Sequence, residues 1–413
     1  MRRRTGLALA AVFGLLALVV VVGVGFTPSG ELTEQWVSDT PRENEINHHA
    51  VGIGPAGDVI VAPVAEVPYA DVPITNSSCE LVRLDPDEGS TVWEVGMPAE
   101  DCYTHALTEP AIEDLDDDSE LEVVVSSTEN ALITYDAETG NEEWRVPLST
   151  YGYGRPTVAN VTPAPGPEVV TSDIEGGVVV VDGDGMVEWR AMLNATQPNP
   201  SVWLAPLVDD FNADGSPEVL LASSNGPVLL SSDGHVEWQS DGAANYLAAA
   251  QVDDDPGSEV FATGRSAIRS YGVGGELAWE RDLSNSRFKT ALDGDGDGTV
   301  ELYVGRIGGR LLALDATTGD TEWSTRLSTN NKAMVQPPVL ADVDGETGPE
   351  VVTVLETGTV VVVDPNSGAE QARYERDVPV WTAPSVADLD GDSADEIIVR
   401  YGDGRVVRLD YVK

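Results

Sequence analysis

Lysine is the scarcest charged residue in this sequence. It occurs only at positions 289, 332 and 413, and the 23 basic residues stand against 71 acidic ones, which gives a formal net charge of −48. A surface this negative repels phosphate backbones and anionic lipid headgroups. Nucleic acid is therefore excluded as a partner.

Chemically reactive side chains are also few. The chain has 2 cysteines and 4 histidines, which leaves few candidates for a nucleophile or a general base. It contains no Gly-x-Ser-x-Gly, His-Glu-x-x-His, phosphate-binding or dinucleotide-binding motif. An enzyme is therefore disfavoured, although the many acidic pairs leave carboxylate-based glycoside cleavage as an alternative.

The only long apolar run lies at the N-terminus. Residues 1–5 carry three arginines, and residues 6–26 are uncharged and long enough, at about 31 Å as a helix, to cross one bilayer. The basic flank places residues 1–5 in the cytoplasm. We expect a single-pass anchor in the cell membrane, a short stalk at 27–30 and an extracellular domain at 31–413. The alternative is a cleaved signal peptide and a secreted protein.

The two cysteines, Cys79 and Cys102, belong to the part of the chain that we expect outside the membrane. Disulfides form and persist in such oxidising surroundings. We therefore expect a disulfide between these two residues. The alternative is a pair of buried thiols.

An acidic loop at residues 293–301 organises the chain. Its carboxylates at places 1, 3, 5 and 9 offer the hard oxygen ligands that suit Ca²⁺. The spacing recurs four times, and four of the five loops follow a proline at a fixed offset, so we favour structural calcium over chance Asp-Gly turns. Residues 251–259 form a weaker copy and residues 160–168 a degenerate one. The predicted ligands are Asp114, Asp116, Asp118, Glu122, Asp210, Asn212, Asp214, Glu218, Asp293, Asp295, Asp297, Glu301, Asp342, Asp344, Glu346, Glu350, Asp388, Asp390, Asp392 and Glu396.

A second motif follows each acidic loop. Residues 315–323 show it best, as an Asp, a Gly turn and a strand marked by Trp. With the apolar segments around the acidic loop, the motif predicts four strands per unit and a period of roughly 40–50 residues, which is typical of propeller blades. The fourth-strand markers are Trp36, Trp93, Trp144, Trp189, Trp238, Trp279, Trp323 and, in place of tryptophan, Tyr374.

The two ends of the domain predict how the ring closes. The last unit reaches Lys413 before any fourth strand, whereas residues 31–36 match the fourth-strand pattern. We expect an all-β fold, an eight-bladed β-propeller with four-stranded blades, in which the N-terminal strand completes the last blade and removes an open sheet edge. Seven blades and a degenerate unit are the alternative.

These motifs resemble those of two propeller families. The loop Asp-x-Asp-x-Asp-Gly-x-x-Glu resembles the FG-GAP repeats of integrin-like propellers, and Asp-x-x-Thr-Gly-x-x-x-Trp resembles the tryptophan-docking repeats of PQQ-like, or quinoprotein, propellers. Together the resemblances cover nearly everything after Glu31. The abundance of Asp with little Lys resembles proteins of salt-loving archaea, whose salt screens self-repulsion; an acidic, calcium-loaded extracellular protein is the alternative.

The resemblance to quinoproteins has limits. It implies, for the dehydrogenases, adjacent cysteines over the cofactor and an axial calcium beside a catalytic Asp. Here the two cysteines are 23 positions apart. In size the chain is closer to the non-catalytic outer-membrane assembly scaffold of that superfamily. A PQQ-dependent or other enzyme with its site at the propeller channel remains the alternative function.

Aromatic residues indicate where binding would occur. Tyr153, Trp203 and Trp381 each lie seven positions before an acidic loop, where the chain enters the innermost strand. We expect them, with an insert at residues 63–78, on the face opposite the acidic loops, as a recognition surface; rings that only fill the channel are the alternative. His48, His49 and His105 should approach the same face. We favour ordinary strand-start histidines, and a transition-metal site of three imidazoles is the alternative.

The sequence therefore favours a binding function. We expect a membrane-anchored, calcium-stabilised extracellular β-propeller that serves as a binding or scaffold module for a protein or glycan partner at the cell surface. Fold alone does not determine the activity of a propeller.

Overall fold

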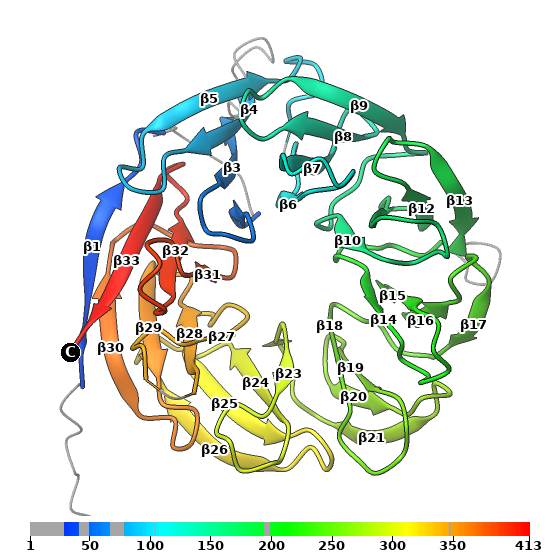
Figure 1. Cartoon of the computed structure of the whole chain (residues 1–413). Helices are drawn as coiled ribbons and strands as arrows, with labels where there is room; N and C mark the ends of the chain where they lie inside the picture. The colour runs from blue at the N-terminus through cyan, green and yellow to red at the C-terminus, as the bar shows by residue number, and fades with distance from the viewer. Residues whose placement is uncertain (1–28, 41–48, 67–77, 104, 194–198, 347) are drawn as a thin grey trace, which may run out of the picture.

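The computed structural model describes residues 29–40, 49–66, 78–103, 105–193, 199–346 and 348–413. These residues form eight sheets arranged in a ring (Figure 1). The predicted eight-bladed, all-β propeller is confirmed. Among the described residues no helix is long and apolar enough to cross a membrane. The predicted anchor at 6–26, the segment 1–5 and His48 lie outside them.

Each blade runs from an innermost strand at the central axis to an outermost strand at the rim (Figure 1). Blades 1 to 4 are β2–β5 (Gly52–Ile53, Ile60–Glu66, Ser78–Leu84, Thr91–Gly96), β6–β9 (Ala111–Glu113, Glu122–Ser127, Ala131–Asp136, Glu142–Pro147), β10–β13 (Thr157–Ala159, Glu168–Ser172, Gly177–Val181, Val187–Met192) and β14–β17 (Leu207–Asp209, Glu218–Ser223, Gly226–Leu230, Val236–Gln239). Blade 1 corrects the expected insert at residues 63–78, because residues 63–66 belong to β3 and Ser78 belongs to β4. Residues 67–77 lie outside the described residues.

Blades 5 to 8 repeat the arrangement with two variations. They are β18–β21 (Tyr246–Ala250, Glu259–Thr263, Ile268–Tyr271, Leu277–Arg281), β22–β26 (Ser286–Arg287, Ala291–Leu292, Glu301–Arg306, Arg310–Asp315, Thr321–Arg326), β27–β30 (Val339–Ala341, Glu350–Val354, Thr359–Val363, Glu370–Glu375) and β31–β33 (Ser385–Ala387, Glu396–Arg400, Val406–Val412) completed by β1 (Glu31–Val37). In blade 6 the innermost strand is divided into β22 and β23, which both pair with β24.

The ring closes as predicted. Strand β1 pairs antiparallel with β33, and Leu32 lies opposite Tyr411 while Trp36 lies opposite Arg408. The first strand of the domain thus hydrogen-bonds to the last, which leaves blade 8 with four strands. Blade 8 has no turn between its third strand, β33, and its fourth, because the fourth strand is β1 from the other end of the domain.

The middle strands are buried on both faces because blades pack against blades. Val124 and Leu132 of blade 2 pack with Val179 and Val181 of blade 3 in one cluster. This packing explains why the valine run in β29 shows no polar alternation. The outer strands alternate between exposed and half-buried positions, as in β26.

Tryptophans of the outermost strands link neighbouring blades. The indole N–H of Trp144 donates to the carbonyl oxygen of Gly183 in the next blade at 2.8 Å. A Cβ on Gly185 would lie only 2.7 Å from that ring, and Gly185 has φ +77°, so the turn requires glycine there. Equivalent bonds to the next blade, at 2.6–3.0 Å, are made by Trp36, Trp93, Trp189, Trp279 and Trp323.

The same geometry explains the missing eighth tryptophan. Tyr374 lies on the outermost strand of blade 7, and its neighbour is blade 8, which has no third-to-fourth turn to receive an indole. The Tyr374 hydroxyl instead donates to the Glu34 carboxylate of β1. The substitution therefore marks the seam of the ring.

Candidate functional site

The two ends of the innermost strands form two candidate sites. In five blades a proline directly precedes the innermost strand, and an acidic or degenerate loop follows it; the prolines are Pro110, Pro156, Pro206, Pro338 and Pro384. Proline suits a strand start because it has no N–H to donate. We call the end with the acidic loops the acidic face and the opposite end the channel mouth.

On the acidic face the five full loops bring carboxylates together. In each cluster one potential ligand oxygen per residue lies within 4.8 Å of all the others. These clusters could hold a metal ion, and oxygen-only donor sets suit hard cations such as Ca²⁺. Asp118, Glu346 and Asp392 lie outside them. The clusters are Asp114, Asp116, Glu122; Asp210, Asp214, Glu218; Asp293, Asp295, Asp297, Glu301; Asp342, Asp344, Glu350; and Asp388, Asp390, Glu396.

The first Asp of the loop also shapes the backbone. Asp293 accepts a hydrogen bond from the N–H of Gly298 at 3.0 Å, and Asp114 accepts one from Ser119 at 3.0 Å. Equivalent bonds reach Asp210 and Asp388. Hydrogen bonds within each loop therefore hold the carboxylates close to one another, which lowers the ordering cost of binding an ion.

The last glutamate of the loop has a second, recurrent role. Its carboxylate accepts the backbone N–H of the residue seven positions earlier, at 2.7–3.1 Å, in seven blades. The glutamates are Glu122, Glu168, Glu218, Glu259, Glu301, Glu350 and Glu396. Because Glu168 keeps this bond in the degenerate loop, the glutamate braces the loop even where the other carboxylates are missing.

Burial disfavours the charged form of these glutamates. It is the largest cause of a shift that raises the pKa of Glu122, Glu218, Glu301, Glu350 and Glu396 to about 7, and neighbouring carboxylates contribute to the same shift. A bound cation would stabilise the ionised form and oppose this shift. The clusters therefore combine suitable donors with an electrostatic demand for positive charge.

Two of the five loops already receive positive charge from the chain. The Arg408 guanidinium lies 2.9 Å from Asp390 and 3.4 Å from Glu396 in blade 8. The Lys413 ammonium lies 3.3 Å from Asp344 in blade 7. Among the described residues, the clustered carboxylates of blades 2, 4 and 6 have no such ion pair. The five loops are therefore not electrostatically equivalent.

At the channel mouth a cavity of about 420 Å³ lies on the propeller axis. Each of the eight blades contributes at least one lining residue near the start of its innermost strand. Tyr153, Trp203 and Trp381 all line it, which brings the three predicted aromatic residues together. The other lining residues are His49, Glu109, Gly154, Arg155, Leu204, Ala205, Leu207, Tyr246, Leu247, Arg287, Phe288, Lys289, Pro337, Thr382 and Ala383.

The rings at the mouth touch one another. The centroid of Tyr153 lies 5.1 Å from Trp203, 4.7 Å from His49 and 4.6 Å from His105. Burial raises the pKa of Tyr153 to about 12, so its hydroxyl stays protonated. Trp203 is 43% exposed, and its indole N–H donates to no described residue, unlike the indoles that link blades. This ring is available to a ligand.

The mouth also gathers cations that the sequence analysis did not single out as a group. Arg155, Arg287 and Lys289 line the cavity together with one carboxylate, Glu109. Lys289 occupies the place of the missing proline in blade 6, where the innermost strand divides. A lysine in place of the recurring proline, in a chain with so few lysines, was the sequence signal that could have indicated these cations.

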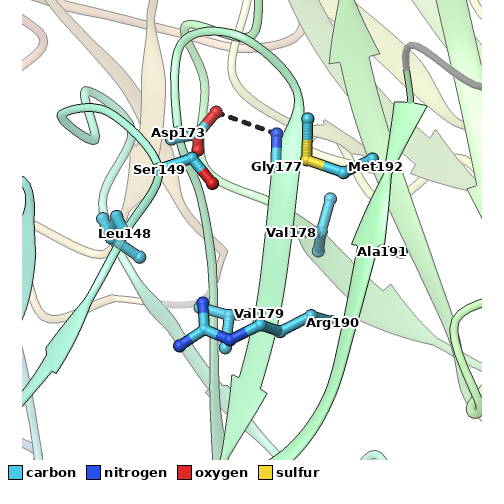
Figure 2. Close-up of a pocket in the computed structure, with 9 residues that line it drawn as sticks. All are labelled: Leu148, Ser149, Asp173, Gly177, Val178, Val179, Arg190, Ala191 and Met192. Carbon is cyan, nitrogen blue, oxygen red and sulfur yellow. Dashed lines mark hydrogen bonds between the residues drawn. The ribbon is translucent and has the colours of Figure 1, made fainter.

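A second cavity of about 170 Å³ is lined by strands β12 and β13 of blade 3 and by Leu148 and Ser149, which follow β9 of blade 2. Figure 2 shows Asp173 and Arg190 at opposite ends of its lining. Asp173 accepts the Gly177 N–H at 2.8 Å, and Arg190 donates to the Pro147 carbonyl oxygen at 3.0 Å. Both charged groups serve the backbone, so the channel mouth is the stronger binding candidate.

The two cysteines are bonded to each other in the structure. Cys79 of β4 and Cys102, which follows β5, form a disulfide with Cα atoms 5.4 Å apart. Both residues are buried beside Ala65 and Ala106, and neither lines the channel cavity. The disulfide therefore ties the exit of blade 1 to its third strand.

Comparisons with known proteins agree with the fold. A family model described as outer membrane protein assembly factor BamB matches residues 77–271 and 256–407. BamB from Moraxella catarrhalis has a similar structure, with a TM-score of 0.58, 17% identity and coverage of 92% of this chain and 99% of that one. A search of curated proteins found no match.

Two further solved structures, of proteins with different names, share this architecture. The V. cholerae biofilm matrix protein Bap1 aligns with a TM-score of 0.66, 13% identity and coverage of 93% and 91% of the two chains. The quinohemoprotein alcohol dehydrogenase ADHIIG of Pseudomonas putida HK5 aligns with a TM-score of 0.66 and 12% identity, over 93% of this chain and 76% of that one. At these identities the likeness shows the fold alone.

Proposed function

The chain belongs to the PQQ-like repeat family described as outer membrane protein assembly factor BamB, and from this premise we propose that it is a binding or scaffold module. In this proposal residues 6–26 anchor the chain in the cell membrane, and the propeller lies outside the cell. Its acidic face holds calcium that stabilises the fold, and its channel mouth binds a protein or glycan partner.

The observation that carries the proposal is the composition of the channel mouth. Trp203 and Tyr153 meet at 5.1 Å in a cavity to which every blade contributes. Clustered aromatic rings with a few polar groups are typical of ligand and partner sites. Seven of the nine tryptophans lie on outermost strands, whereas Trp203 and Trp381 line the cavity.

Calcium has a structural role in this proposal. Each full loop connects the first and second strands of a blade, so an ion there would hold the two strands together by neutralising three or four carboxylates. The buried glutamates, with pKa values raised by desolvation, supply the electrostatic reason. The resemblance of these loops to FG-GAP repeats also supports this role.

The second candidate function is a quinone-dependent enzyme, favoured by the similarity to a quinohemoprotein dehydrogenase. The residues at the mouth do not fit that cofactor's usual surroundings. Neither cysteine lines the cavity, and Glu109 is the one acidic residue among the lining residues. The acidic clusters lie at the other ends of the innermost strands, so they offer no calcium cage beside a quinone. We therefore derive no reaction through it.

The test compares partner capture by channel-mouth variants. The full chain, wild type or Trp203→Ala with Trp381→Ala, would be cross-linked in its native membrane and its partners identified. Met186→Ala is the matched control, since Met186 is 66% exposed on another part of the surface. We expect the wild type and the control to capture the same partner and the double variant to lose it while it remains folded at the temperature of the experiment.

Two results would contradict the proposal. One is a double variant that keeps every partner of the wild type. The other is reduction of a redox dye by the purified full chain after addition of PQQ, because that activity would establish the enzyme instead.

A further inference from the structure

We propose that the channel mouth binds a small, carboxylate-bearing ring compound, the chemistry of a sugar acid. This inference rests on the proposed function, because it assigns a ligand class to the same face. It begins from a charge distribution that runs against the rest of the molecule.

The cavity lining reverses the charge bias of the chain. Eighteen residues line the cavity, and at the average composition of the chain about one of them would be basic and about three acidic. Instead three are basic and one is acidic, which gives the lining a net charge of +2 with histidine neutral. In a chain with a net charge of −48, this pocket is where an anion would be attracted rather than repelled.

The three cations have more N–H donors than their hydrogen bonds to the described residues use. Arg155 Nε and Lys289 Nζ each lie 4.0 Å from the same oxygen of Glu109, beyond hydrogen-bond distance. Arg155 makes one hydrogen bond to the described residues, from Nε to the carbonyl oxygen of Pro110 at 3.1 Å. Arg287 donates to Gln336 through one of its nitrogens. A ligand carboxylate could therefore accept hydrogen bonds from Arg155 and Lys289 that Glu109 does not take.

The rest of the lining specifies a ring beside the carboxylate. Trp203 and Tyr153 present aromatic surface, and Leu204, Leu207 and Leu247 complete an apolar wall. A volume of about 420 Å³ lies within the range of small-molecule sites, about 300–1,000 Å³. An inorganic anion would leave the aromatic surface unused, whereas a sugar acid would use both the rings and the cations.

Electrostatics favours a small anion over an acidic polymer. At physiological salt, charges act over about 8 Å, so a polymer that extended beyond the cavity would face the acidic remainder of the surface. A single ring that fits inside the cavity meets the local positive charge. The expected ligand is therefore a free sugar acid or a terminal acidic sugar.

The experiment measures binding of glucuronate to the full chain in detergent by isothermal titration calorimetry. Glucuronamide, which has the same ring and no charge, and glucose serve as matched probes. We expect glucuronate to bind at least about tenfold more tightly than glucuronamide, since a charge-assisted hydrogen bond contributes about this much. The preference should weaken as salt rises.

Variants of the lining give effects of opposite sign. Lys289→Gln should weaken glucuronate binding by about tenfold, while Lys332→Gln, a matched change at an exposed lysine outside the lining, should leave it unchanged. Glu109→Gln should strengthen binding, because it removes the anion that competes for both cations. The two lysine changes should leave the melting temperature within about 1 °C, since surface substitutions have small effects.

The outcomes separate this inference from the proposed function. Equal affinity for glucuronate and glucuronamide, or no binding of either, would overturn the inference. If the wild type then still captured a partner that the double variant Trp203→Ala with Trp381→Ala lost, the proposed binding function would stand without the sugar-acid inference. Unchanged glucuronate affinity in Lys289→Gln would overturn the assignment of the cation site.

Discussion

The C-terminal ends of the innermost strands carry clustered carboxylates, whereas their N-terminal ends carry aromatic rings and cations. Residues 114–122 and 293–301 belong to the first group, and Tyr153, Trp203 and Lys289 belong to the second. The acidic groups are braced by hydrogen bonds within their own loops. The rings and cations face a cavity and make few bonds to the protein. In the function that we propose, one end serves stability and the other binding.

Calcium removal should lower the stability more than any of the substitutions below. A site saturated at a hundred times its Kd contributes about 2.7 kcal/mol to stability, so chelation of several sites with EGTA should lower the melting temperature by about 10 °C or more. Differential scanning calorimetry in concentrated salt measures it, and added Ca²⁺ should restore the original value. An unchanged melting temperature would show that the clusters hold no stabilising calcium.

Arg408→Gln should separate the loop of blade 8 from the others. Arg408 is buried and contacts Asp390 and Glu396, so its removal without calcium should cost about 3 kcal/mol. With calcium the cost should shrink, because the vacated carboxylates can bind an ion more tightly. Urea unfolding with and without calcium measures both values.

Arg373→Gln is the matched control for that experiment. Arg373 pairs with Glu370 on the outer strand β30, away from any acidic loop, so its effect should not depend on calcium. A calcium-independent cost for Arg408→Gln would mean that the arginine and a metal ion do not compete.

Glu122→Gln and Glu168→Gln should differ in their dependence on calcium. Both carboxylates accept a backbone N–H, at 2.7 and 2.8 Å. The glutamine amide oxygen can still accept this bond but carries no charge, so the weaker bond should cost about 1 kcal/mol in each variant. Only Glu122 belongs to a carboxylate cluster. Glu122→Gln should therefore also reduce the number of calcium ions bound, as counted by atomic emission, whereas Glu168→Gln should leave that number intact.

Trp203→Ala should have the smallest effect on stability, below about 1 kcal/mol, because its ring is 43% exposed. Trp189→Ala is the contrasting variant. Its indole donates to the Ser232 carbonyl oxygen at 2.8 Å across two blades, and its loss should cost about 3 kcal/mol. Thermal unfolding compares the two. Equal costs would place Trp203 among the residues that hold blades together.

The sequence predicted the architecture because its signals are local and repeated. The acidic loop, the Gly turn and the fourth-strand tryptophan recur at a nearly constant interval, so each copy supports the others. The addition of β1 to blade 8 could be predicted from the incomplete last repeat. The predicted start of the insert at Pro63 was wrong, because β3 continues through Glu66 and pairs with β4.

Other features were not predicted because they depend on contacts that follow no repeated spacing in the sequence. Tyr374 replaces a tryptophan because the neighbouring blade has no turn to receive an indole. Arg408 approaches Asp390 because β33 lies beside β32 in blade 8. Lys413 reaches Asp344 across two blades. None of these partners has a fixed offset in the sequence.

The sequence by itself determined the number of blades, the place of the carboxylates and the closure of the ring, because strand period and turn chemistry are properties of short segments. Only the tertiary structure decided which charges meet. Closing eight blades around one axis brings Glu109, Arg155 and Lys289 from three separate blades to one cavity. A ring concentrates the starts of its innermost strands, so the chemistry of its channel is a property of the closed fold.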